Sequence, residues 1–107
     1  METQNAIAAL AALAQETRLD VFRLLVRSGA DGLAAGAVGQ ALGVPAATLS
    51  FHLKELKSAG VVRCRRDGRS LIYSADFDAV NALLAFLMES CCQADGGPAS
   101  PNVNPKA

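Results

Sequence analysis

The 107 residues suffice for one small domain, and with 51% apolar and 19% charged residues they can bury a core, which excludes a charged disordered tail. Ten Lys and Arg balance ten Asp and Glu, which excludes a generally basic coat protein for nucleic acid but leaves room for a local basic patch. No apolar run approaches the roughly 18 residues of a membrane span, and the first residues lack the pattern of a secretory signal. Three cysteines, two of them adjacent, argue against a disulfide framework. We therefore expect a cytoplasmic protein with free thiols.

Two helices are predicted before residue 32. Apolar residues recur at helical spacing along residues 6–14. Thr17, with Asp20 three residues later, is placed to cap a second helix in the manner of a capping box. That helix has one apolar face, formed by Leu19, Phe22, Leu25 and Val26. The small and polar residues 28–32 then predict a turn.

A pair of short helices follows. Residues 33–42 predict a helix that Gly43 ends, although Gly36 and Gly39 each cost about 1 kcal/mol relative to alanine. Residues 46–58 predict a second helix, with Pro in its first turn and Ala-Gly at its end. Its inward positions are Leu49, Leu53 and Leu56. This spacing predicts a helix-turn-helix.

The last predicted elements are a β-hairpin and a helix. Residues 61–66 and 70–74 predict two strands, joined by a turn at Asp67-Gly68. Asp76 is placed to cap a helix over residues 77–92, with an apolar stripe of Phe77, Val80, Leu84, Leu87 and Cys91. The Pro- and Gly-containing residues 93–107 predict a disordered tail. We therefore expect one mainly α-helical domain over residues 1–92.

A helix-turn-helix followed by a basic hairpin is typical of DNA binding, because a helix fits the major groove and a hairpin beside it reaches the backbone or minor groove. Between residues 52 and 69 there are six Lys and Arg residues but only two acidic residues. Each part has another interpretation, since basic residues protect strand edges and short polar side chains satisfy local backbone groups, while a lone histidine is often a surface or capping residue. The combination favours DNA binding. The predicted DNA contacts are Thr48, Ser50, Phe51, His52, Lys54, Lys57, Arg65, Arg66 and Arg69.

Residues 45–74 resemble the recognition helix and wing of ArsR/SmtB-type winged-helix repressors. The matching pieces are Thr48–Leu53, Leu56, Ala59–Val62, Arg66–Arg69 and Tyr73, and residues 17–25 are similar to the second helix of that family. The resemblance implies a winged helix-turn-helix that forms a homodimer and leaves its operator when a metal or metalloid binds. The apolar stripes Ile7/Leu10/Leu13 and Val80/Leu84/Leu87 of the first and last helices are the expected interface. A twofold dimer predicts a palindromic operator.

Cys91 and Cys92 are the candidate sensing residues. Adjacent thiolates can chelate a soft ion, and trivalent arsenic or antimony takes two or three sulfur ligands. The resemblance supports this, since some arsenic-responsive members carry vicinal cysteines at the end of the last helix. Packing of Cys91 as a small apolar residue is the alternative. Cys64 is interpreted as structural, although it or a thiol of the partner protomer is a possible third ligand.

Zinc, nickel and cobalt sensing are disfavoured, because Ala34 and Gly36 stand where many family members have Cys-x-Cys and His52 is the only histidine. We expect no permanently bound cofactor, only an arsenical or antimonial inducer. A thiol-redox regulator is the competing hypothesis, and since a disulfide between neighbours is strained it would need a bridge between protomers. An enzyme is not expected, because a cysteine nucleophile would lack a base and the sequence has no Gly-rich phosphate loop.

Overall fold

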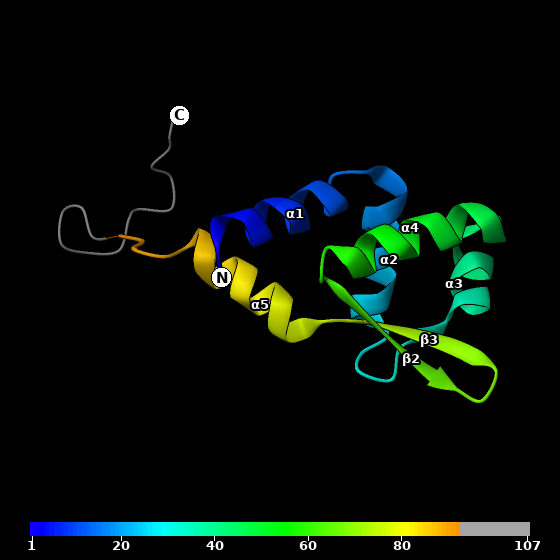
Figure 1. The fold of residues 1–107 in the computed structure, drawn as a ribbon. Coiled ribbons are helices and arrows are strands. Elements are labelled where there is room, and N and C mark those ends of the chain that lie inside the picture. Colours follow the sequence, from blue (N-terminus) through cyan, green and yellow to red (C-terminus); the bar gives the residue numbers. More distant parts are fainter. Residues whose placement is uncertain (93–107) are drawn as a thin grey trace.

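The computed structural model describes residues 1–92, so the predicted disordered tail over residues 93–107 lies outside the described residues. Figure 1 shows the elements in space. In chain order they are α1 (Thr3–Leu13), α2 (Glu16–Arg27), β1 (Leu33–Ala34), α3 (Ala35–Leu42), α4 (Ala46–Ser58), β2 (Val62–Asp67), β3 (Ser70–Ala75) and α5 (Phe77–Leu87).

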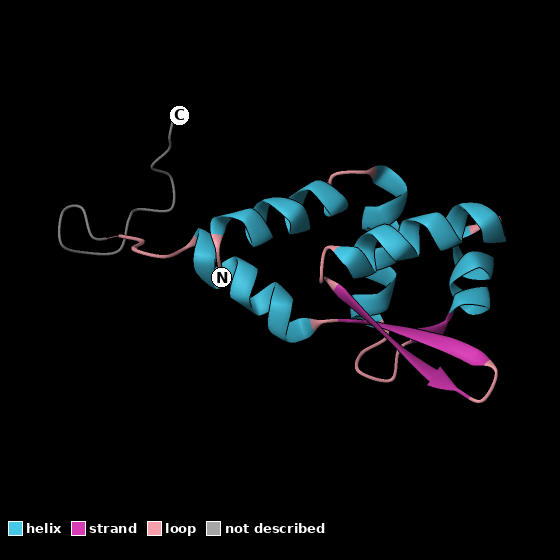
Figure 2. Cartoon of the chain, viewed as in Figure 1, coloured by secondary structure: helices cyan, strands magenta, loops and turns pink. Residues whose placement is uncertain are grey.

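The strands form one antiparallel sheet in the order β1-β3-β2, and the β2–β3 hairpin projects beside α3 and α4 (Figure 2). This arrangement of helices with a β-hairpin wing confirms the predicted winged helix-turn-helix fold. Within residues 1–92, no helix combines the length and the apolar character needed to cross a membrane.

The core lies between α2, α3, α4 and the start of the hairpin. Its fully buried side chains are Val21, Leu25, Val38, Leu53, Leu56 and Val61. The buried residues of helix α1 are all alanines, at Ala6, Ala9 and Ala12, and Leu13 packs half-buried against the core. Because burial of a leucine-sized side chain is worth about 1.5–3 kcal/mol, the larger side chains of α2 and α4 supply most of the stabilisation.

The start of α2 differs from the prediction. Helix α2 begins at Glu16, and the Gln15 side chain caps it by accepting a 2.8 Å hydrogen bond from the Arg18 backbone N–H. The predicted cap at Thr17 is therefore wrong, because this residue already lies inside the first turn. The predicted apolar face is also partly wrong: Val21, Phe22 and Leu25 are buried, whereas Leu19 and Val26 are exposed.

Two predicted boundaries shift because of strand pairing. Leu33 and Ala34 were expected to be helical, but they pair with Tyr73 and Ile72 as β1. The hairpin turn lies at Gly68-Arg69, one residue later than predicted, because Asp67 still pairs with Ser70. Gly68 has φ +64°, a left-handed conformation suited to a two-residue turn.

Helix α5 begins as predicted and ends early. The Asp76 carboxylate accepts a 3.0 Å hydrogen bond from the Ala79 backbone N–H, which confirms the predicted cap. The helix ends at Leu87, and residues 88–92 form turns in which Ser90 and Cys92 have positive φ. The predicted helix over residues 77–92 is therefore too long. Cys91 does not lie on the apolar stripe of α5.

Candidate nucleic-acid interface and cysteine pair

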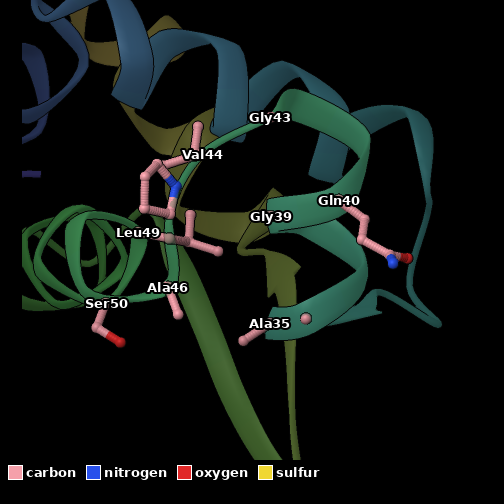
Figure 3. A pocket seen from close by; sticks show the side chains of 10 residues that line it. Ala35, Gly39, Gln40, Gly43, Val44, Ala46, Leu49 and Ser50 are labelled. Atoms are coloured by element: carbon pink, nitrogen blue, oxygen red, sulfur yellow. The ribbon is translucent and has the colours of Figure 1, made fainter.

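The helix-turn-helix is compact where α3 meets α4. Gly43 ends α3 in a left-handed conformation (φ +66°). A Cβ atom at Gly39 would lie 3.1 Å from the Val44 carbonyl oxygen, so glycine permits the close approach of the turn. Between the two helices lies a cavity of about 510 Å³ lined mostly by small residues (Figure 3). Ser50 is at its edge, one turn after Ala46.

Most of the predicted contact residues on α4 face solvent. Thr48, Ser50, Lys54 and Lys57 are all exposed. Phe51 is 56% exposed, which is unusual for an aromatic side chain on a small domain. The exposed face of α4 therefore offers hydroxyl, aromatic and cationic groups together, which suits contacts to bases and phosphates.

His52 does not belong to this face. Its side chain is only 8% exposed, and its ring packs edge-on against Phe51 with 5.6 Å between ring centroids. Its Nδ1 is buried and has no hydrogen-bond partner among residues 1–92. Most of the His52 side chain is therefore withdrawn from the surface, and its contact with DNA stays a prediction. Position 52 lies one helical turn from the buried residues Leu49 and Leu56, so its side chain lies at the border of the buried face of α4.

The hairpin arginines divide into two groups. Arg66 and Arg69 are exposed near the hairpin tip. Arg65 is also exposed, but its Nη2 donates a 3.0 Å hydrogen bond to the Asp31 carbonyl oxygen, which joins the hairpin to the loop before β1. Arg63 forms both ion pairs found within residues 1–92, with Asp76 (Nε to Oδ2, 3.1 Å) and Asp78 (Nη2 to Oδ2, 3.5 Å).

These contacts change the acidity of Asp76. Partial burial raises the pKa of this carboxyl group, but the Ala79 backbone N–H and the Arg63 guanidinium outweigh burial and hold the pKa below its usual value. The hydrogen bond to Asp76 and the charge of Asp76 raise the pKa of Arg63. From the sequence, Asp76 was predicted only to cap a helix. Its ion pair with Arg63 was missed, because only the β2–β3 register brings the two side chains together.

Cys91 and Cys92 are joined by a disulfide within one chain. A disulfide of this pair therefore does not have to bridge two protomers. The expectation of free thiols in a reducing compartment stays a prediction. Side chains of neighbouring residues diverge by about 100° on a helix. Both cysteines lie beyond the end of α5, where the positive φ of Ser90 and Cys92 releases them from that geometry.

Cys64 lies elsewhere in the fold. It is a free, half-buried thiol on β2 opposite Tyr73 on β3. Burial and the neighbouring Cys64 thiol raise the pKa of Tyr73. In the part of the chain that the structure describes, no group of three or more His, Cys, Asp and Glu side chains is arranged to hold a metal ion. Within one protomer, the described residues thus offer the Cys91/Cys92 pair as two sulfurs without a third ligand.

The predicted interface helices expose large apolar side chains. Helices α1 and α5 lie together at the end of the molecule opposite α3 and the hairpin tip (Figure 1). The exposed apolar side chains here include Ile7 (59%), Leu10 (43%), Leu84 (54%), Leu87 (52%) and Met88 (61%). We call these five residues the α1/α5 apolar face. Exposed apolar side chains gathered on two neighbouring helices commonly mark a protein–protein contact.

Comparisons with known proteins agree with the fold. Residues 13–65 match a helix-turn-helix domain family. The chain is 33% identical to the HTH-type transcriptional regulator YgaV of Escherichia coli over 89 residues, which are 83% of this chain and 88% of the relative.

Two solved structures extend this similarity. An ArsR-like transcriptional regulator from Rhodococcus sp. RHA1 superposes with a TM-score of 0.70 at 26% identity, covering 78% of this chain and 76% of that one. A homodimeric winged helix-turn-helix DNA-binding domain from Mycobacterium bovis, described as a possible ArsR-family regulator, has a TM-score of 0.66 at 28% identity and covers 79% and 77%.

Proposed function

Because this chain belongs to the ArsR-like family of winged helix-turn-helix transcriptional regulators, we propose that it is a homodimeric repressor that binds a palindromic operator and leaves it when trivalent arsenic or antimony binds Cys91 and Cys92. The observation that carries the DNA-binding part is the exposed face of α4, continuous in sequence with a hairpin whose tip presents Arg66 and Arg69. In this proposal α4 enters the major groove and the hairpin contacts the backbone beside it.

The α1/α5 apolar face supports the proposed dimer. Its side chains are between 43% and 61% exposed in a single protomer, so a second copy would bury apolar surface that a monomer leaves in water. The M. bovis relative is described as homodimeric. A twofold axis through this face would place two α4 helices on the same side of the dimer. Half-sites one helical turn apart, about 34–36 Å, would then be read together.

The cysteine pair supports the proposed inducer. Reduction of the disulfide by a cellular thiol consumes two thiols, releases their disulfide and leaves Cys91 and Cys92 as free thiols. Arsenite, As(OH)₃, would then exchange two hydroxyl groups for two sulfurs and release two molecules of water. Soft thiolate ligands select ions of this class over hard cations. A monomethylated arsenical would need the same two sulfurs and no third ligand.

A direct test measures fluorescence anisotropy of labelled duplex DNA, selected from a random pool by the reduced protein, while arsenite is added. We expect tight binding that weakens at higher salt and is lost on arsenite addition. The Cys92→Ser variant should bind DNA equally well and ignore arsenite, and Cys64→Ser is the matched control that should still respond. Release of the Cys92→Ser protein by arsenite would exclude the proposed sensing site.

A redox regulator is the second candidate, because the structure holds the Cys91–Cys92 disulfide within one chain. Here oxidation of the two thiols to the disulfide, with an external disulfide taking up the two electrons, would itself weaken DNA binding. The same anisotropy assay with oxidised glutathione in place of arsenite separates the candidates. Non-reducing electrophoresis should then show a monomer band, whereas a bridge between protomers would give a covalent dimer.

A further inference from the structure

One side chain links the DNA-binding hairpin to the helix that leads to the cysteine pair. Arg63 lies near the start of β2, paired with Ser74 on β3, and its guanidinium contacts Asp76 and Asp78. Asp76 is the cap of α5 and Asp78 lies in the first turn of that helix. We call Arg63, Asp76 and Asp78 the Arg63 clamp. Within residues 1–92, no other side-chain hydrogen bond or ion pair joins the hairpin to the start of α5.

The clamp acts where two rigid elements meet. The two carboxylate oxygens of Asp76 have separate partners, since Oδ1 accepts from the Ala79 backbone N–H at 3.0 Å and Oδ2 contacts Arg63. The Asp76 backbone N–H also donates to the Val61 carbonyl oxygen at 2.9 Å, just before β2. The direction in which α5 leaves the sheet is therefore tied to the base of the hairpin. Asp76 is the shared element of both attachments.

The clamp lies between the hairpin tip, which contacts DNA in the proposed function, and the cysteine end of α5, which binds the inducer. This inference therefore rests on the proposed function. Strand β2 continues from Arg63 to Arg66, and Arg69 follows in the turn, so a rotation of β2 at its base moves the hairpin tip. Helix α5 continues from Asp76 to Leu84 and Leu87 on the α1/α5 apolar face, and then to Cys91 and Cys92. The junction that the clamp closes therefore lies on the chain path between these two ends.

We propose that Arg63 is a positioning residue that sets the angle between the hairpin and α5, and so transmits a change at the cysteine end of α5 to the DNA contacts of the hairpin. In this role Arg63 does not contact DNA. Its cationic group neutralises Asp76 and Asp78. Its removal loosens the junction, which then keeps only the Asp76–Val61 backbone hydrogen bond, while every DNA-contacting side chain is retained.

The competing interpretation is that Arg63 is one more phosphate contact, since its side chain is 62% exposed on a basic hairpin. The two roles predict opposite effects on DNA affinity when the carboxylate of Asp76 is removed. Removal of a carboxylate beside DNA lowers repulsion and should strengthen binding if charge alone matters. If Asp76 acts through the clamp, its neutralisation should weaken binding. Asn caps helices as well as Asp, so Asp76→Asn removes the ion pair and keeps the cap.

The experiment compares DNA affinity for the reduced full-length wild type, Arg63→Gln, Asp76→Asn and the double variant, at several salt concentrations and without arsenite. Asp67→Asn is the matched control, because this exposed hairpin carboxylate forms no ion pair within residues 1–92. Thermal melts verify that each variant is folded. The DNA is the duplex selected by the wild type.

We expect Arg63→Gln and Asp76→Asn each to weaken DNA binding by about 5-fold, at the low end of typical coupling between sites. The double variant should be no weaker than either single variant, since both remove the same interaction. The salt dependence of binding should be unchanged, and Asp67→Asn should bind slightly more tightly. A fall of about one in the salt slope for Arg63→Gln, together with tighter binding by Asp76→Asn, would overturn the proposal in favour of a phosphate contact.

Two further readings separate this proposal from the proposed function. If the wild type binds DNA but ignores arsenite, the inducer is wrong, while the affinities above still decide the role of Arg63. If the wild type binds no DNA, the clamp is tested by measuring the distance between two spin labels by electron paramagnetic resonance. The labels are attached at Arg69→Cys and Asn81→Cys, with the natural cysteines changed to serine. The distance distribution should broaden on Arg63→Gln. An unchanged distribution would refute the clamp.

Discussion

The contact between α3 and α4 allows a paired test with two glycines of the same helix. Gly36 and Gly39 both lie in α3, and replacement of a helical glycine by alanine gains about 0.5–1 kcal/mol, because the unfolded chain loses conformational freedom. At Gly36 nothing lies within 4 Å of the added Cβ. Gly36→Ala should therefore raise the free energy of unfolding by roughly the full propensity gain.

At Gly39 the added methyl group would come close to the turn between α3 and α4. The added Cβ would lie 3.1 Å from the Val44 carbonyl oxygen and 3.4 Å from Leu49 Cδ2. The carbonyl oxygen belongs to backbone between two helices and cannot rotate away as a flexible side chain can. Overpacking of this kind costs about 1–3 kcal/mol, which exceeds the propensity gain. We expect Gly39→Ala to lower the free energy of unfolding by about 1 kcal/mol, the propensity gain being subtracted from that cost.

Urea unfolding followed by circular dichroism measures both variants at one fixed protein concentration, since the stability of a dimer depends on concentration. The two variants should differ by about 2 kcal/mol, or very roughly 10 °C in melting temperature. DNA affinity should fall for Gly39→Ala, because the start of α4 must shift to accommodate the methyl group. Equal stabilisation by both substitutions would refute the conclusion that the α3–α4 contact requires glycine.

Three further outcomes are expected. The low pKa of Asp76 stabilises the folded protein above about pH 4, so wild type and Asp76→Asn should differ in free energy of unfolding near pH 6 and converge as acid titration passes through the folded-state pKa. In sedimentation, Leu84→Glu should give monomers because it charges the α1/α5 apolar face, while Leu71→Glu on the hairpin should stay dimeric. His52→Leu should raise the free energy of unfolding by about 1 kcal/mol, because it removes an unpartnered buried nitrogen. The same variant should keep its DNA affinity within about twofold of the wild type. A large loss of affinity would identify His52 as a DNA contact.

The order of the elements was predictable because its signals are local. Helical periodicity in α1, α2 and α4, the Asp76 cap and the change to strand-forming residues after Gly60 each depend on neighbours within a few positions. The same locality made Thr48, Ser50, Lys54 and Lys57 identifiable as exposed residues of α4. Charge clustering along the hairpin needed no knowledge of the fold.

Predictions were wrong where a residue far away in the sequence determines the local structure or the burial of a side chain. Leu33 and Ala34 are helix formers by sequence, but pairing with Tyr73 and Ile72 makes them a strand, since their backbone groups find partners on β3. His52 looks polar and exposed on a helical projection, yet the elements packed around α4 bury it. The junction of Arg63 with Asp76 depends on strand register, which two separate segments set together.

The amino-acid sequence by itself determined that this chain makes a winged helix-turn-helix with a basic hairpin and a vicinal cysteine pair, because periodicity, capping and charge are properties of short segments. Only the tertiary structure decided which arginines stay free and which are tied to carboxylates and carbonyls, where α5 ends, and how Cys91 and Cys92 lie beside each other. These features require groups far apart in the chain to meet, or a helix to stop without a local breaker, and such events follow from packing of the whole domain.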